Sequence, residues 1–138
     1  MKKKKIVTFG EIMLRLTTPD NLRIQQSHDF LVSYGGSEAN VAISIANFGG
    51  DVDYITRLPD NALGETCLSE LRSHNIGTQN ILIGGKRLGT YYMEKAAAMR
   101  NSKVIYDRDG SAFSELKPGM IDWKEVFKDA DIFHWSGI

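Results

Sequence analysis

The sequence predicts an α/β fold: a doubly wound parallel sheet flanked by helices, with a small added β element. Two short runs with apolar centres, 6–9 and 131–135, are typical of buried strands. Between residues 37 and 74, two segments instead repeat apolar residues at helical spacing. The middle of the chain returns to short strand-like runs. The resulting order is strand, helix, strand, helix, β-rich segment, helix and strand.

The first strand is expected at 6–9, where an apolar run ends at Gly10. Glu11 follows at the edge of the sheet where ligands often bind in α/β proteins. The apolar residues after it indicate that the chain continues extended as far as Leu16. The sequence Thr-Thr-Pro-Asp-Asn at 17–21 then predicts a turn.

A buried helix is expected from Ser37, because apolar residues cover much of its circumference, and Gly49 closes it. Residues 59–61 open a second helix, and 75–77 supply a left-handed cap at its end. The segment 84–86 predicts a turn between two later strands. The elements after Gly49 are a strand at 51–57, a helix at 62–74, strands at 80–83, 90–93 and 104–106, a helix at 122–130 and a strand at 131–135.

The composition indicates a globular protein whose partners are small molecules or protein, with no nucleic acid and no membrane among them. The chain has 138 residues, of which 42% are hydrophobic, and its 17 basic residues balance 17 acidic ones. Lys2 to Lys5 are interpreted as a solvated lead-in to the first strand. No apolar run is long enough for a bilayer span or a secretory signal, so we expect a cytoplasmic protein.

The sulfur and imidazole side chains predict no reactive or metal centre. Cys67 is the only cysteine and is expected to be a small buried apolar residue rather than a catalytic thiol. His28, His74 and His134 lack the short paired spacing of a zinc site, so no metal ligand is assigned.

The segment Gly35-Gly36-Ser37-Glu38-Ala39-Asn40 is the strongest candidate for a ligand site. Glycines allow the backbone to approach a ligand closely, and the free N–H groups of a helix start point outward at it. Asn40 offers both a donor and an acceptor to a hydroxyl group. The alternative is an ordinary helix-start amide that bonds to the adjacent loop.

A family resemblance rests on three segments: Gly35 to Ala42, Phe48-Gly49 and Leu58 to Gly64. These resemble the ribokinase-like carbohydrate kinases of the phosphofructokinase-B family, and the match spans nearly the whole chain. The resemblance implies that residues 1–138 are the N-terminal portion of one ribokinase-like domain, with lid strands from about 12–33 and 86–110. It also implies substrate contacts from Gly35, Gly36, Ser37, Glu38, Ala39 and Asn40.

A narrower resemblance, to the 2-keto-3-deoxygluconate kinases, rests on Gly89-Thr90-Tyr91, Tyr106-Asp107-Arg108 and Gly110-Ser111-Ala112. It implies that Tyr91, Tyr106 and Arg108 line the sugar pocket. A guanidinium can hold the carboxylate of a sugar acid with two parallel hydrogen bonds, which a neutral hexose cannot accept. The alternatives are cross-strand packing for the tyrosines, and a surface ion pair of Arg108 with Asp107 or Asp109.

The catalytic part of the family's motif is not in this sequence. In the family, a Gly-Ala-Gly-Asp segment near the C-terminus supplies the phosphate-binding amides and the aspartate base. Gly49-Gly50-Asp51 is superficially similar, but it closes a predicted helix and precedes a strand. We therefore assign no catalytic residue, expect ATP and Mg²⁺ to bind outside this chain, and predict no turnover by the chain alone. Because the chain stops at Ile138 directly after a predicted strand, we expect an incomplete domain, with a naturally short variant as the alternative.

The predicted function is an ATP-dependent sugar kinase that acts on 2-keto-3-deoxygluconate, of which this chain is the sugar-binding part. Fructokinase or ribokinase specificity is one alternative, and a non-catalytic sugar-binding or dimerising module is another. A dinucleotide-binding domain is rejected, because Gly10-Glu11-Ile12 lacks the required glycine spacing. The resemblance further implies a homodimer formed through the lid.

Overall fold

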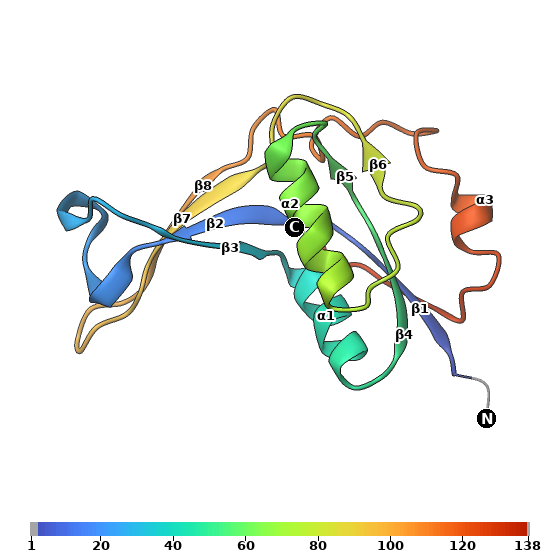
Figure 1. The fold of residues 1–138 in the computed structure, drawn as a ribbon, viewed down its shortest axis with the longest axis horizontal. Coiled ribbons are helices and arrows are strands. Elements are labelled where there is room, and N and C mark those ends of the chain that lie inside the picture. The colour runs from blue at the N-terminus through green and yellow to red at the C-terminus, as the bar shows by residue number, and fades with distance from the viewer. Residues whose placement is uncertain (1–2, 138) are drawn as a thin grey trace.

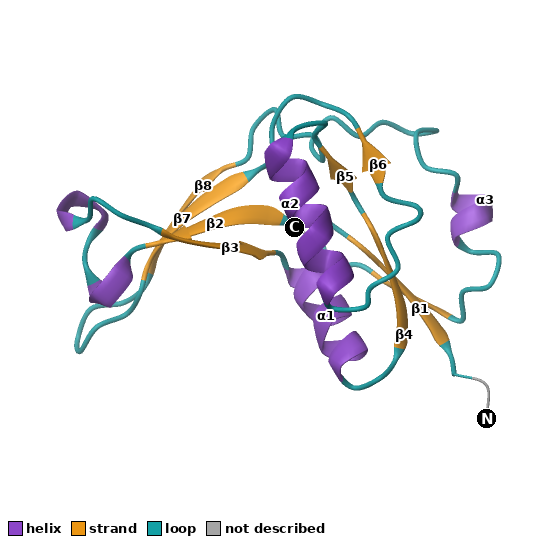
Figure 2. Ribbon diagram, in the orientation of Figure 1, coloured by secondary structure: helices purple, strands orange, loops and turns teal. Residues whose placement is uncertain are grey.

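The computed structural model describes residues 3–137 and has two parts (Figure 1). Helices and parallel strands form a body, and a second, elongated sheet extends away from it on the left of the view. Figure 2 shows that the long helices belong to the body and that the extension consists mainly of strands. The α/β fold predicted from the sequence is confirmed.

The body is built on three parallel strands in the order β4-β1-β9. These are β1 (Lys5–Phe9), β4 (Asp51–Ile55) and β9 (Ile132–His134). Ile6 of the central strand pairs with Val52 on one side and with Ile132 on the other. The strands predicted at the two ends of the chain therefore lie next to each other in one sheet.

Helices cover both faces of this sheet, as a doubly wound fold requires. The helices α1 (Ser37–Asn47) and α2 (Ala62–Ser73) pack on one face, where Ala42, Tyr54 and Leu71 are fully buried. On the opposite face, Val7 and Ile55 pack against Val126 of the short helix α3 (Trp123–Val126). Alternate residues of β1 and β4 thus face different layers, because side chains alternate along a strand.

The predicted helix ends are present. The Asn61 side chain caps α2 by accepting hydrogen bonds from the N–H groups of Leu63 and Gly64, at 3.1 and 3.2 Å. After α2, Asn75 adopts a left-handed conformation with φ of 60°. Gly49 follows α1 with φ of 75°, and β4 begins two residues later, at Asp51.

The second sheet has four strands in the order β3-β2-β7-β8. Its strands are β2 (Met13–Thr17), β3 (Leu31–Gly35), β7 (Thr90–Glu94) and β8 (Lys103–Asp107). The pair β2/β7 is parallel, and the other two pairs are antiparallel. Between β2 and β3, the predicted turn contains the 3-10 helix η1 (Pro19–Asn21), and η2 (Ile24–Gln26) follows it.

The structure differs from the sequence predictions in three places. The strand predicted at 51–57 is interrupted at Thr56, and β5 (Arg57–Leu58) pairs with β6 (Leu82–Ile83) in a separate parallel sheet. The chain bends after β6, at glycines with positive φ, but β6 and β7 belong to different sheets and do not pair with each other. The last helix is shorter than the predicted 122–130, because the helical turn capped by Asp122 ends at Val126.

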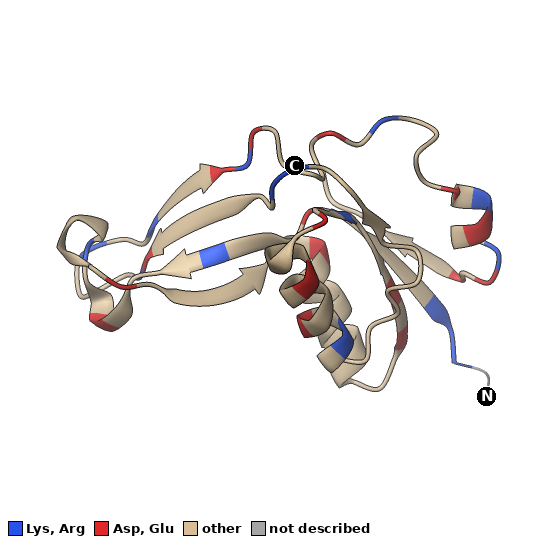
Figure 3. Ribbon diagram, turned by 45° about the horizontal axis from the view of Figure 1, so that its top comes forward, with Lys and Arg blue, Asp and Glu red and all other residues tan. Residues whose placement is uncertain are grey.

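Charged residues of both signs are interspersed over the body and the second sheet (Figure 3). This distribution agrees with the equal numbers of basic and acidic residues in the sequence. Within residues 3–137, no helix combines the length and the apolar character needed to cross a bilayer.

Candidate functional site

A pocket of about 380 Å³ lies where the start of α1 meets the second sheet. It brings together residues from three distant parts of the sequence, and six of them were predicted from the sequence as site residues. The lining residues are Met13, Gly36, Ser37, Asn40, Tyr91, Tyr106 and Arg108. Met13 was not predicted; it is the first residue of β2, two residues after Glu11, and lies on the same face of this strand as Arg15 because side chains alternate along a strand.

The start of α1 forms one wall of the pocket. Gly36 is the N-cap residue, and among the described residues no side chain caps this helix. The helix start therefore brings the partial positive charge of a helix N-terminus to this wall. Glycine is needed at this point for a steric reason, since a Cβ on Gly36 would lie 2.1 Å from the Glu11 carbonyl oxygen.

Three predicted contact residues do not line this pocket. Ala39 is fully buried in the core cluster of the body. Gly35 lies behind Tyr91, and a Cβ on it would be 2.7 Å from the Tyr91 hydroxyl oxygen. Glu38 is 1% exposed and lines a smaller adjoining pocket of about 150 Å³. The segment therefore contributes two residues, Gly36 and Ser37, together with Asn40 from the first turn of the helix.

The buried carboxylate of Glu38 joins the start of α1 to the segment after β9. It accepts hydrogen bonds from the Ser37 hydroxyl at 2.9 Å, from the Ser136 N–H at 3.0 Å and from the Ser136 hydroxyl. Burial by itself raises the pKa of Glu38, but these hydrogen bonds to the charged form outweigh it, so the pKa lies below the usual value of 4.5. Glu38 is thus a charged internal tie between two parts of the body.

The second sheet supplies an aromatic wall. Tyr91 and Tyr106 are directly opposed on β7 and β8, with ring centroids 5.7 Å apart and planes inclined by 36°. The cross-strand packing expected as the alternative is therefore present, and both rings line the pocket as well. Tyr106 is 60% exposed, so much of its ring remains free for contact.

Arg108 follows directly after β8 and pairs with Glu11. Its Nη2 atom lies 2.6 Å from Oε2 of Glu11, whose side chain is 1% exposed, whereas the Arg108 side chain is 33% exposed. The predicted alternative, a surface pair with Asp107 or Asp109, is wrong, because Asp107 pairs with Arg87 at 2.9 Å. The partner of Arg108 is internal, and Arg108 is also one of the residues that line the pocket.

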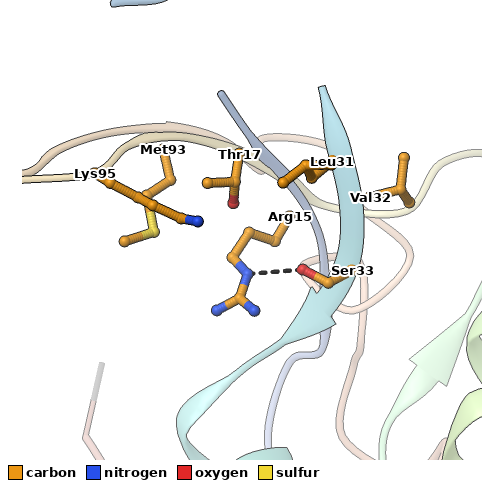
Figure 4. Close-up of a pocket in the computed structure, with 7 residues that line it drawn as sticks. All are labelled: Arg15, Thr17, Leu31, Val32, Ser33, Met93 and Lys95. Atoms are coloured by element: carbon orange, nitrogen blue, oxygen red, sulfur yellow. Dashed lines mark hydrogen bonds between the residues drawn. The ribbon is translucent and has the colours of Figure 1, made fainter. Parts of the chain in front are cut away.

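A further pocket lies on the same face of the second sheet, nearer its outer end (Figure 4). The pairing of Arg15 with Ser33 and with Tyr91 places these three side chains on one face with Tyr106. Arg15 Nε donates a hydrogen bond to the Ser33 hydroxyl at 2.8 Å, and Leu31 beside it is 55% exposed. This face therefore continues from the 380 Å³ pocket to the tip of the sheet.

Comparison with known proteins identifies the family. The model of the pfkB family of carbohydrate kinases matches residues 3–138. The chain belongs to this family. The ribokinase-like fold and the family membership expected from the sequence are therefore confirmed.

Three relatives illustrate where the chain stands within the pfkB family. The crystal structure of 2-dehydro-3-deoxygluconokinase from Thermotoga maritima is 48% identical, with a TM-score of 0.93, and the match covers 95% of this chain and 40% of that one. A 2-dehydro-3-deoxygalactonokinase from Haloferax volcanii is 34% identical over 97% of this chain and 42% of its own length. Probable fructokinase-2 from Arabidopsis thaliana is 28% identical over 96% of this chain and 40% of its own length. The chain thus spans about two fifths of the length of these kinases.

Gly49, Asp51 and Cys67, which the sequence analysis had set aside as catalytic groups, have structural positions in this pfkB chain. Gly49 and Asp51 end a helix and begin a strand, as predicted, so they do not form a phosphate-binding turn. Cys67 is fully buried, and burial raises its pKa to about 12, which keeps the thiol protonated. Residues 3–137 contain no group of three or more His, Cys, Asp or Glu side chains that could hold a metal ion.

Proposed function

We propose that this chain is the sugar-binding part of an ATP-dependent carbohydrate kinase whose substrate is a sugar acid, 2-keto-3-deoxygluconate. The observation that carries the proposal is the position of Arg108 in a 380 Å³ pocket beside the start of α1, whose N-cap residue Gly36 has no side chain. Both features favour a negatively charged group. The guanidinium can hold a carboxylate with two parallel hydrogen bonds, and the helix start carries partial positive charge.

The other lining residues suit the hydroxyl groups of the same substrate. Asn40 offers a donor and an acceptor, and the Ser37 hydroxyl, which donates to Glu38, still offers an acceptor; both residues are exposed at the start of α1. Tyr91 and Tyr106 provide ring faces for the carbon skeleton and hydroxyl groups for hydrogen bonds. These side chains would hold the acceptor hydroxyl in place, and positioning is a large part of catalysis in phosphoryl transfer.

Two of the relatives act, by name, on 2-dehydro-3-deoxy sugar acids. The gluconate and the galactonate share the carboxylate that Arg108 would bind, so this residue does not distinguish between them. Fructose carries no carboxylate, and Arg108 therefore argues against the fructokinase alternative. Assays with both sugar acids and with fructose separate these three specificities.

Carbohydrate kinases of this family use ATP. The sequence contains no Gly-Ala-Gly-Asp segment, and we propose that the base, the phosphate-binding amides and the sites for ATP and Mg²⁺ lie in the remainder of a longer protein. The residues present here are not a nucleotide site, and their part is to bind the acceptor. A cytoplasmic location stays a prediction from the sequence.

We further propose that the second sheet is a lid over the sugar and that it pairs with a second copy of the protein. In support, β8 is exposed along its whole length, and Leu31 and Val104 are partly exposed on the face that continues from the pocket. An apolar face of this kind is expected to be covered by another surface. A homodimer through the lid would cover it.

The experiment is a coupled ATPase assay on the full-length product of the coding sequence, with 2-keto-3-deoxygluconate, its galactonate epimer and fructose as acceptors. We expect turnover with sugar acids from the full-length protein and none from the 138-residue chain. A stop codon directly after Ile138, or fructose as the preferred acceptor, would contradict the proposal.

A further inference from the structure

We propose that Glu11 is the positioning residue for Arg108: its buried carboxylate holds the guanidinium at the pocket wall in the orientation that selects an acidic sugar. This inference deepens the proposed function and rests on it for the identity of the sugar. Glu11 itself does not line the 380 Å³ pocket, so its effect on the substrate passes through Arg108.

The Glu11 carboxylate is built into the structure. It lies in the connection between β1 and β2 and is 2% exposed. Oε1 accepts a hydrogen bond from the Ser111 hydroxyl at 2.6 Å. Among the described residues, Oε2 has no aligned hydrogen-bond donor, so the ion pair with Arg108 at 2.6 Å is what offsets the burial of its charge.

The surrounding backbone leaves space for this carboxylate and little else. A Cβ on Gly89, just before β7, would lie 2.4 Å from Oε1 of Glu11. Glu11 thus meets the start of β7 through Gly89 and the segment after β8 through Arg108 and Ser111. Because β7 and β8 are antiparallel, these contacts lie at the same end of the β7/β8 pair, and one side chain therefore meets both strands at the end next to the body.

The ion pair leaves part of the guanidinium free. An arginine has five N–H donors, and the contact with Glu11 involves the single atom Nη2. Arg108 lines both the 380 Å³ pocket and the smaller pocket behind it, which Glu11 also lines. The arginine is therefore held from behind by Glu11, while its remaining donors are available to a carboxylate in front.

The first test measures the hold on Arg108 without any substrate. Arg108 and Arg87 are labelled with phenylglyoxal, and the rates of modification are followed by peptide mass spectrometry. In Glu11→Gln, we expect Arg108 to react about threefold faster or more, because its partner charge is gone, while Arg87 is unchanged. In the matched control Asp107→Asn, Arg87 should react faster and Arg108 should be unchanged, because Asp107 pairs with Arg87 at 2.9 Å. An unchanged rate at Arg108 in Glu11→Gln overturns the proposal.

The second test measures selection of the substrate by the full-length enzyme. Glu11→Gln should raise KM for 2-keto-3-deoxygluconate about tenfold while changing kcat less, because a misplaced guanidinium loses the paired hydrogen bonds to the carboxylate. Glu11→Asp keeps the charge and should restore part of the loss, and Asp107→Asn should leave KM unchanged. If Glu11→Gln does not fold, Ser111→Ala keeps the Glu11 charge, removes the 2.6 Å hydrogen bond to it together with the one that the Ser111 hydroxyl accepts from the Ser114 N–H, and should shift KM in the same direction by less.

The outcomes separate this inference from the function on which it rests. If Arg108→Lys changes the preference for sugar acids but Glu11→Gln does not, the role of Glu11 is overturned and the proposed function stands. If Arg108→Lys changes nothing, the proposed function fails, and the role of Glu11 in selecting the sugar fails with it.

Discussion

The body and the second sheet of this protein bury their side chains to very different extents. In the body, the central strands are covered on both faces, and Val7, Tyr54 and Ile55 are fully buried. In the second sheet, β8 is exposed at every residue, and Leu31 of the opposite edge strand is 55% exposed. The body therefore has the packing of a folded core, whereas the second sheet leaves its edge strands and apolar side chains exposed.

The candidate site lies on the boundary between these two parts. Gly36 and Asn40 come from the start of α1, whereas Tyr91 and Tyr106 come from the exposed sheet and Arg108 directly follows its edge strand. A site divided in this way can combine fixed positioning from the body with a wall that meets the ligand from the other side. The contrast also predicts that mutations in the two parts will affect different properties.

The largest effect on stability is expected for Leu71→Ala in α2. Leu71 is fully buried, so the mutation should reduce the free energy of unfolding by about 2–5 kcal/mol through lost burial and a cavity. Leu63→Ala on the same helix is the matched control, since Leu63 is 47% exposed, and it should cost about 0.5 kcal/mol or less. Urea unfolding measures both, and equal losses would show that the core is not where the structure has it.

The next largest effect is expected for Gly36→Ala at the boundary. The added Cβ would be 2.1 Å from the Glu11 carbonyl oxygen, so the start of α1 must shift, at a cost of about 1–3 kcal/mol. The same shift should abolish sugar binding in calorimetry. Gly137→Ala, where a Cβ would meet nothing within 4 Å, is the control and should change neither quantity. Normal sugar affinity in Gly36→Ala would remove the helix start from the site.

A smaller effect, on assembly alone, is expected for Leu31→Glu on the second sheet. In the proposed dimer this change buries an unpaired carboxylate. The dissociation constant of the dimer should therefore rise at least roughly tenfold, as measured by analytical ultracentrifugation of the full-length protein. Phe48→Glu is the control, because Phe48 is an apolar residue of the body that is 91% exposed. If both variants dimerise equally well, the exposed face of the second sheet is not the dimer interface.

The smallest effect is a pH dependence from Glu38. Its pKa in the folded protein is below 4.5, so its charged form stabilises the fold above that pH, and this contribution is lost as the pH falls through the folded pKa. Glu38→Gln should therefore lose less stability than the wild type between about pH 6 and about pH 3. Glu65→Gln, an exposed carboxylate in the first turn of α2, should behave like the wild type in urea unfolding. If the unfolding free energy of Glu38→Gln depends on pH as steeply as that of the wild type, Glu38 does not have the lowered pKa described here.

Local patterns in the sequence were sufficient for most of the fold. The helix from Ser37, the cap at Asn61 and the left-handed Asn75 all follow from residues within one or two turns of each other. The division of strands among three sheets could not be predicted in the same way. The residues of β5 and β6 look like ordinary strand residues, and their separate pairing depends on contacts that no local pattern encodes.

Residues of the candidate site that form a motif on one element could be predicted from the sequence. A contact between side chains from distant segments could not. The Gly36 to Asn40 segment was found because its residues are adjacent, although Glu38 and Ala39 turned inward once the helix was packed. Arg108 was predicted to contact the ligand, and the only protein partners considered, as an alternative, were its sequence neighbours Asp107 and Asp109, whereas the structure brings Glu11 to it from the first β connection. The available signal was a charged residue at 11 between two apolar runs, which requires a buried partner.

The most direct test of the account is the preference of the full-length enzyme for sugar acids in the Arg108→Lys variant. The ratio of kcat/KM for 2-keto-3-deoxygluconate to kcat/KM for fructose should fall by about tenfold or more, because lysine cannot bind a carboxylate with two parallel hydrogen bonds. An unchanged ratio would mean that the arginine at the boundary between body and sheet does not bind the substrate.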